Sequence, residues 1–158
     1  MDKTLELTEI YKSTIEDALG LIVNIDDDGD LRFKHPDLGT FFISIDAIND
    51  PEFMMLQYPA FMDAKSGLSE DDLHTICNQT NRRCKGAKLF VTNNEDRDVY
   101  ASLQMLVALP GEMPTKDYLA ATLKRALSMV SNSVNNFTQE ARMILVSNNK
   151  KIADLKLH

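Results

Sequence analysis

One run of residues has the spacing of a calcium site. Asn24, Asp26, Asp28 and Gly29 stand at positions 1, 3, 5 and 6 of an EF-hand loop, in which oxygen ligands hold the ion. Position 12 of that loop needs a bidentate glutamate, and here it is His35. In the flanking segments, apolar and polar residues alternate as they do in β-strands. We therefore interpret the run as a hairpin turn, whose Asp-Gly pair supplies the positive φ of a tight connection.

Three other side chains could bind a metal ion or act as a nucleophile: His74, Cys77 and Cys84. The two cysteines share a helical face with Leu73 and Ile76, which is where buried, unreactive cysteines lie. His74 points off that face, because successive helical residues are about 100° apart. No C-x-x-C or H-x-x-x-H pair supplies the ligands of a structural zinc site. We predict no metal site, no cofactor and no catalytic residue.

Asn78 and Asn81 lie on one side of the same predicted helix. The two amides could bind a polar ligand, or they could tie the helix to a neighbouring strand end or turn through hydrogen bonds. We expect the second role.

Glycine-rich phosphate loops, G-x-S-x-G and H-E-x-x-H are all missing from the sequence, so it predicts no enzyme. The alternative is a small-ligand-binding or enzymatic domain whose pocket is assembled from distant residues.

Composition narrows the class of protein. With 158 residues, 44% hydrophobic and 26% charged, the chain has the size and balance of one globular domain, residues 1–158. The net charge of −7 argues against nucleic acid. No apolar run reaches the roughly 20 residues of a membrane span, and the N-terminus lacks a secretory pattern. We therefore expect a cytoplasmic protein that binds no membrane.

The charges are unevenly distributed along the chain. Residues 1–72 hold 17 acidic and 5 basic side chains, whereas residues 73–158 hold 7 acidic and 12 basic ones. The two halves could attract each other within one fold. They could also form a polar surface that orients a partner.

The elements that position these residues follow from periodicity. Residues 4–18 have the apolar spacing of a helix, and alternation then predicts strands at 21–25, 31–34 and 40–46. Pro59 is expected to end a fourth strand, 53–59.

In the second half, Ser69 should cap a helix that runs to about Arg83. Strands are expected at 89–92 and 99–109, and Thr115 should cap a long C-terminal helix from about 115 to 147. The predicted fold is α+β, in the order α-β-β-β-β-α-β-β-α with a mainly antiparallel sheet.

Two apolar features suggest interactions. The segment 53–62 is apolar on both strand faces, which indicates either a strand covered on both sides or an adaptable partner surface. Its candidate partner-binding residues are Phe53, Met55, Tyr58, Phe61 and Met62. In the last helix a heptad-like spacing predicts a seam for a homodimer, formed by Leu123, Leu127, Val130, Val134 and Phe137.

The order of these elements resembles the type III secretion chaperone fold, and more specifically the bacterial sensory transduction regulator family, which shares it. Four stretches carry the resemblance: Asp26–Phe33, Thr40–Asp46 with Asp50–Phe53, Asn78–Asn81, and Lys85–Val91. The resemblance implies a non-enzymatic, often dimeric protein that binds other proteins. Secretion chaperones hold an unfolded effector segment, but the long C-terminal helix departs from their pattern. We therefore predict a protein-binding or regulatory module.

Overall fold

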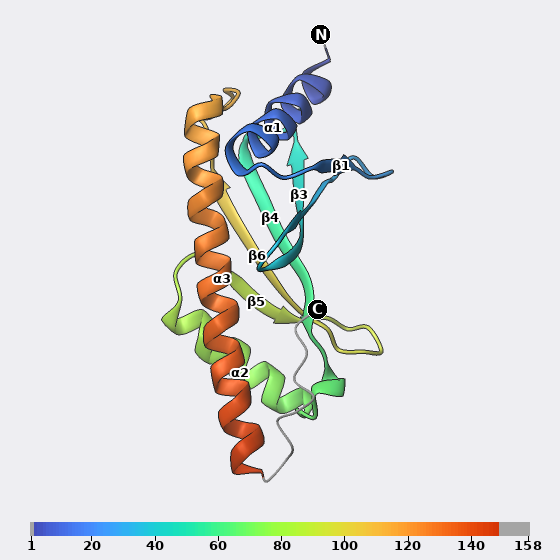
Figure 1. Ribbon diagram of the computed structural model, residues 1–158, viewed down its shortest axis with the longest axis vertical. Helices are drawn as coiled ribbons and strands as arrows, with labels where there is room; N and C mark the ends of the chain where they lie inside the picture. Colours follow the sequence, from blue (N-terminus) through green and yellow to red (C-terminus); the bar gives the residue numbers. More distant parts are fainter. Residues whose placement is uncertain (1, 149–158) are drawn as a thin grey trace. The chain divides into compact units, whose positions relative to one another are not determined.

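The computed structural model describes residues 2–148 (Figure 1). Its helices and strands follow the predicted order, with one short 3₁₀ turn added. The elements are α1 (Lys3–Leu19), β1 (Val23–Ile25), β2 (Leu31–His35), β3 (Gly39–Asp46), β4 (Asp50–Met62), η1 (Ala64–Ser66), α2 (Glu70–Arg83), β5 (Lys88–Val91), β6 (Val99–Leu106) and α3 (Lys116–Ser147). The predicted α+β class is confirmed.

The strands form one antiparallel sheet in the order β1-β2-β3-β4-β6-β5. Short turns set the register of the first three strands, which pairs Leu31 with Ile43 and Phe33 with Phe41. The two phenylalanine rings stack with their centroids 5.7 Å apart. Aromatic cross-strand pairs of this kind stabilise a sheet and hold its register.

Backbone contacts divide the chain into two compact units. Unit 1 comprises the residues up to Gln57 together with Leu103–Ser128, and unit 2 comprises Tyr58–Ser102 together with the residues from Met129 onward. The strands β4 and β6 and the helix α3 run through both units. A single domain over residues 1–158 stays a prediction.

Unit 1 contains α1, which packs on β1 and β3. Asp2 caps the helix by accepting a hydrogen bond from the Thr4 N–H, and Gly20 ends it at a φ of 66°. One face of α1, the inward residues of the strands and the first turns of α3 make the core. The core residues are Leu7, Tyr11, Ile15, Leu31, Phe33, Phe41, Ile43, Met54, Leu56, Leu103, Leu119 and Leu123.

Two strand boundaries differ from the predictions. β4 starts at Asp50 and continues past Pro59 to Met62, because an irregular backbone accommodates the proline. Ala60, directly after it, has a φ of 48°. β6 ends at Leu106, three residues before the predicted end, and Leu109 is 67% exposed. Pro110 follows at a turn that is closed by the hydrogen bond from Glu112 N to Leu109 O.

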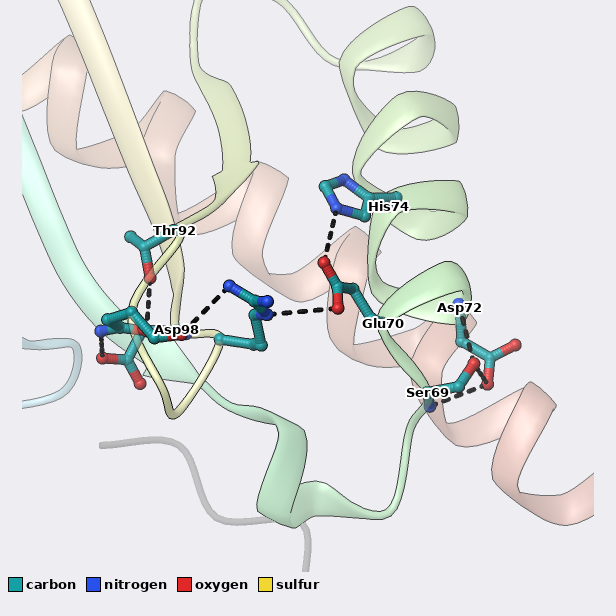
Figure 2. A network of polar contacts seen from close by, with 8 residues as sticks. Ser69, Glu70, Asp72, His74, Thr92 and Asp98 are labelled. Carbon is teal, nitrogen blue, oxygen red and sulfur yellow. Dashed lines mark hydrogen bonds and ion pairs between the residues drawn. The ribbon is translucent and has the colours of Figure 1, made fainter.

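Unit 2 contains α2, β5 and the turn between β5 and β6. Ser69 caps α2 as predicted and forms a capping box with Asp72, whose side chain accepts from the Ser69 N–H. In Figure 2 the Glu70 carboxylate lies between His74 and the turn that carries Thr92 and Asp98. Arg97 of that turn donates to Glu70 at 3.2 Å. These contacts are exposed, and they connect the start of α2 to the turn.

Asn81 has the structural role that the sequence predicts for it. Its Nδ2 donates to Leu89 O at 2.9 Å, and the Leu89 N–H donates to its Oδ1 at 2.8 Å. β5 is an edge strand, and its exposed hydrogen-bonding groups could pair with a strand of another molecule. Asn81 satisfies both backbone groups of Leu89 and so protects this edge.

We predict that Asn81→Ala lowers the free energy of unfolding by about 1–3 kcal/mol, because it leaves two backbone groups of Leu89 unpaired. Urea unfolding followed by circular dichroism measures the change. Asn78→Ala is the matched control, since Asn78 is exposed one turn earlier on α2. Equal losses in the two variants would contradict the role of Asn81.

Candidate protein-binding surface

The five residues predicted to bind a partner differ in how deeply they are buried. Tyr58, Phe61 and Met62 are at most 4% exposed and lie in the core of unit 2. The Phe61 ring meets Phe137 edge to face at 5.4 Å and stacks on Tyr58 at 5.7 Å. A partner cannot reach these three side chains in the folded chain. Their part of the segment therefore fits the alternative of a strand that is covered by its own chain.

The predicted dimer seam is buried as well. Leu123, Leu127, Val130, Val134 and Phe137 are each at most 5% exposed in a single chain. Their spacing therefore describes the apolar stripe with which α3 joins the core. A coiled-coil seam with a second copy would need these side chains to be free, and in the described residues they are not.

Phe53 and Met55 point away from the core, and the structure adds neighbours that the sequence analysis missed. Val107 N donates to Glu52 O at 2.7 Å, which sets Phe53 beside Leu106 and Met55 beside Gln104 in the antiparallel pair. The Gln104 amide lies 3.6 Å from the Met55 sulfur. Leu106 could have been found, because it continues the outward series of Ser102 and Gln104 along β6.

A groove of about 330 Å³ follows β3, β4 and β6. Phe53 and Met55 supply its apolar part, and Asp46 and Asp50 lie at its acidic end. The Asn49 side chain and then its backbone N–H donate hydrogen bonds to Asp46, and they hold the pKa of that carboxyl below its usual value. Asp46 therefore keeps its negative charge under mildly acidic conditions.

A second groove of about 420 Å³ lies where β6 leads into α3. Leu106, Leu109, Met113 and Tyr118 line it, with the carboxylate of Glu112 among them. All of these residues belong to unit 1. Since Leu106 lies beside Phe53, the two grooves adjoin.

We call the combined area the β4–β6 apolar surface. Its members are Phe53, Met55, Leu106, Leu109, Met113 and Tyr118. Four of them are large apolar side chains with high exposed fractions: Phe53 43%, Leu106 51%, Leu109 67% and Tyr118 55%. Large exposed apolar patches rimmed by polar residues are typical of interaction sites.

The side chains that suggested a metal or thiol site have structural roles. Asp26 Oδ1 accepts hydrogen bonds from Asp28 N and Asp30 N, so the acidic run is a hairpin turn. Burial raises the pKa of Cys77 to about 12, which makes its thiol a poor nucleophile. Within residues 2–148, no group of three or more His, Cys, Asp or Glu side chains could hold a metal ion.

This chain is similar to known proteins in its structure and not in its sequence. The sequence matches no protein-family model and no curated protein. YbjN from E. coli, a proposed transcription regulator, superposes with a TM-score of 0.61 at 13% identity, over 80% of this chain and 86% of that one. The HopA1–SchA chaperone–effector complex contains a chain that superposes with a TM-score of 0.54 at 16% identity, over 82% of this chain and 94% of that one.

The fold is type III secretion chaperone-like. The chaperone SycH from Yersinia pestis, in complex with a fragment of YscM2, also matches, with a TM-score of 0.45 at 14% identity, over 77% of this chain and 98% of that one. None of the helices within residues 2–148 is long and apolar enough to cross a bilayer.

Proposed function

We propose that this chain is a non-enzymatic, cytoplasmic module that binds another protein through the β4–β6 apolar surface. The proposal rests on the exposed apolar side chains of this surface, all in unit 1: Phe53, Leu106, Leu109 and Tyr118. Burying them against a partner would contribute about 25 cal/mol for each Å² of apolar area removed from water. The single-domain organisation over residues 1–158 is part of the proposal.

The partner's chemistry follows from the rim of the surface. Asp46 and Asp50 line the first groove, and Glu112 lines the second. An apolar segment with basic residues would complement both the grooves and these charges. We therefore propose an apolar and basic segment of a protein as the ligand.

The cellular role that we propose is regulatory, as in the sensory transduction regulators that the sequence resembles. The superposition on YbjN, a proposed transcription regulator, supports that choice. The superposition on the HopA1–SchA complex supports the binding of a protein partner.

The test is Leu106→Asp, which places a charge at the centre of the surface. We expect at least a roughly 30-fold loss of affinity for the main partner, since central interface residues contribute about 2 kcal/mol or more. Partners captured from a lysate of the native cell are quantified by mass spectrometry, and the affinity of the main one is then measured with the purified protein.

Ile22→Asp is the matched control. Ile22 belongs to unit 1, is 79% exposed and lies outside the surface. Thermal melting should show both variants folded. Unchanged partner binding by a folded Leu106→Asp protein would remove the proposed surface.

A further inference from the structure

We propose that β1 pairs antiparallel with β1 of a second copy of this chain, so that the sheet continues across a homodimer. In this pairing a two-fold axis passes beside Asn24, the middle residue of the strand. The inference goes beyond the proposed function, because β1 lies outside the β4–β6 apolar surface. It also assigns the homodimer to a contact other than the predicted α3 seam, whose side chains are buried.

One edge of the sheet is open, and β1 forms it. Asp26 N donates to Asp30 O at 3.0 Å, and hydrogen-bonded positions alternate along an antiparallel pair. Asn24 therefore bonds to β2, whereas the N–H and C=O groups of Val23 and Ile25 point away from it. Neither of these two residues forms a backbone hydrogen bond to another element in the described part of the chain. Free groups of this kind are a template for pairing with another strand.

The side chains of β1 favour pairing with a strand of the same kind. β1 contains no lysine, proline or bulge, the features that usually prevent edge pairing. Ile25 is 49% exposed although it lies on the core face, next to Leu31 of β2. A pair centred on Asn24 sets Val23 of one copy opposite Ile25 of the other, and the two-fold axis repeats this contact. Each copy then covers the exposed isoleucine of the other.

Charge complementarity selects a second copy as the occupant. A groove of about 590 Å³ beside β1 is lined in part by Ile22, Arg32 and Lys34, with no carboxylate among its described lining residues. Continuing the β1–β2 register places Ile22 beside Lys34. The two-fold pairing places Asp26 of the second copy opposite Ile22, two strand spacings or about 10 Å from Lys34 between Cα atoms. Lysine and aspartate side chains can close this gap, so an ion pair forms on each side of the axis.

The contact is small, and this sets the strength of the dimer. Two three-residue strands cannot bury the roughly 1,600 Å² of a standard interface, so the association belongs to the weak class. We therefore expect a monomer–dimer equilibrium between about 10 and 500 μM, measured by sedimentation equilibrium. Raising the salt concentration from about 50 to about 500 mM should weaken the dimer, since the ion pairs are exposed.

Cross-linking tests the register directly. At the two-fold axis the two Asn24 residues form a non-hydrogen-bonded pair with Cα atoms about 4.5 Å apart, within the range of a disulfide. Asn24→Cys, in a Cys84→Ala chain that lacks the partly exposed native thiol, should therefore form a disulfide dimer on mild oxidation. Arg32→Cys in the same chain is the matched control, because Arg32 is exposed on the same face but one strand further in, about 14 Å from its counterpart. The Asn24→Cys chain should cross-link at least about 10-fold faster.

A proline substitution removes the pairing group itself. Ile25→Pro deletes the N–H that points to the open edge and leaves the hydrogen bonds to β2 in place. It should weaken the dimer by at least about 30-fold, because the two-fold axis doubles the loss of one hydrogen bond per chain. Ile25→Val is the control, since it keeps the N–H and a β-branched side chain, and it should weaken the dimer by less than about 10-fold. Thermal melting should show both variants folded.

Three results would each overturn the inference: a native chain that stays monomeric over the whole concentration range, a folded Ile25→Pro chain that dimerises as well as Ile25→Val, or equal cross-linking of Asn24→Cys and Arg32→Cys. A monomeric native chain whose captured partner is lost in Ile25→Pro would assign the edge to a different molecule, and it would overturn the second copy as the occupant.

The proposed function fails on a different measurement. Leu106→Asp should leave the dimer unchanged, because Leu106 is not part of the β1 pairing. Ile22→Asp places a carboxylate opposite Asp26 of the second copy, so it should weaken the dimer without lowering the affinity of the chain for its captured partner.

Discussion

Phe61→Ala should lower the free energy of unfolding by about 3–5 kcal/mol, the usual cost of truncating a buried phenylalanine. Phe61 is fully buried and contacts the rings of Tyr58 and Phe137, so the alanine would leave a cavity between aromatic side chains. Urea unfolding followed by tryptophan-independent probes, such as far-ultraviolet circular dichroism, measures the loss, since the chain contains no tryptophan.

Phe53→Ala is the control for this prediction, because Phe53 lies on the same strand and is 43% exposed. It should cost less than about 1 kcal/mol of stability but should reduce partner binding. The reverse pattern, with Phe53 costly to stability and Phe61 costly only to binding, would show that the two faces of β4 have been assigned the wrong way round.

Val130→Asp should destabilise the chain by about 4 kcal/mol or more, enough to leave much of it unfolded. Val130 is fully buried in the middle of α3, and a carboxylate there has no described partner to compensate its lost hydration. The measurement is the fraction of folded protein, by circular dichroism and by resistance to proteolysis.

Ser128→Asp serves as the control, since Ser128 is exposed two residues earlier on the same helix. It should change stability by no more than about 0.5 kcal/mol. If the apolar stripe of α3 were instead the seam of a homodimer, Val130→Asp would yield a folded monomer. That result would return the dimer contact to Leu123, Leu127, Val130, Val134 and Phe137.

Residues close together in the sequence determined much of the fold. Asp26 and Gly29 define the first hairpin, and Ser69 with Asp72 defines the start of α2. Such signals are readable because the hydrogen bonds that they use join residues two to four positions apart. The tie between Asn81 and Leu89 was also expected in kind, although its strand partner could be named only from the structure.

The boundaries of β4 and β6 could not be read in the same way. Proline at position 59 normally predicts a strand end, but the irregular backbone at Ala60 lets β4 continue. Leu109 fits an alternating pattern, but β6 has already ended at Leu106. In both cases the conformation of the backbone beside the last strand residues, and not the alternating pattern, marks where the strand ends.

By itself, the sequence determined the element order and the α+β class, because periodicity, caps and turns are local properties. The chaperone-like fold was what its resemblance to a known family implied. Only the tertiary structure decided which apolar residues remain exposed. A regular apolar stripe requires that a face be covered, but it does not say whether its own chain or another molecule covers it. For Phe61, Val130 and Phe137 the cover is the chain itself, whereas Phe53, Leu106 and Tyr118 remain exposed.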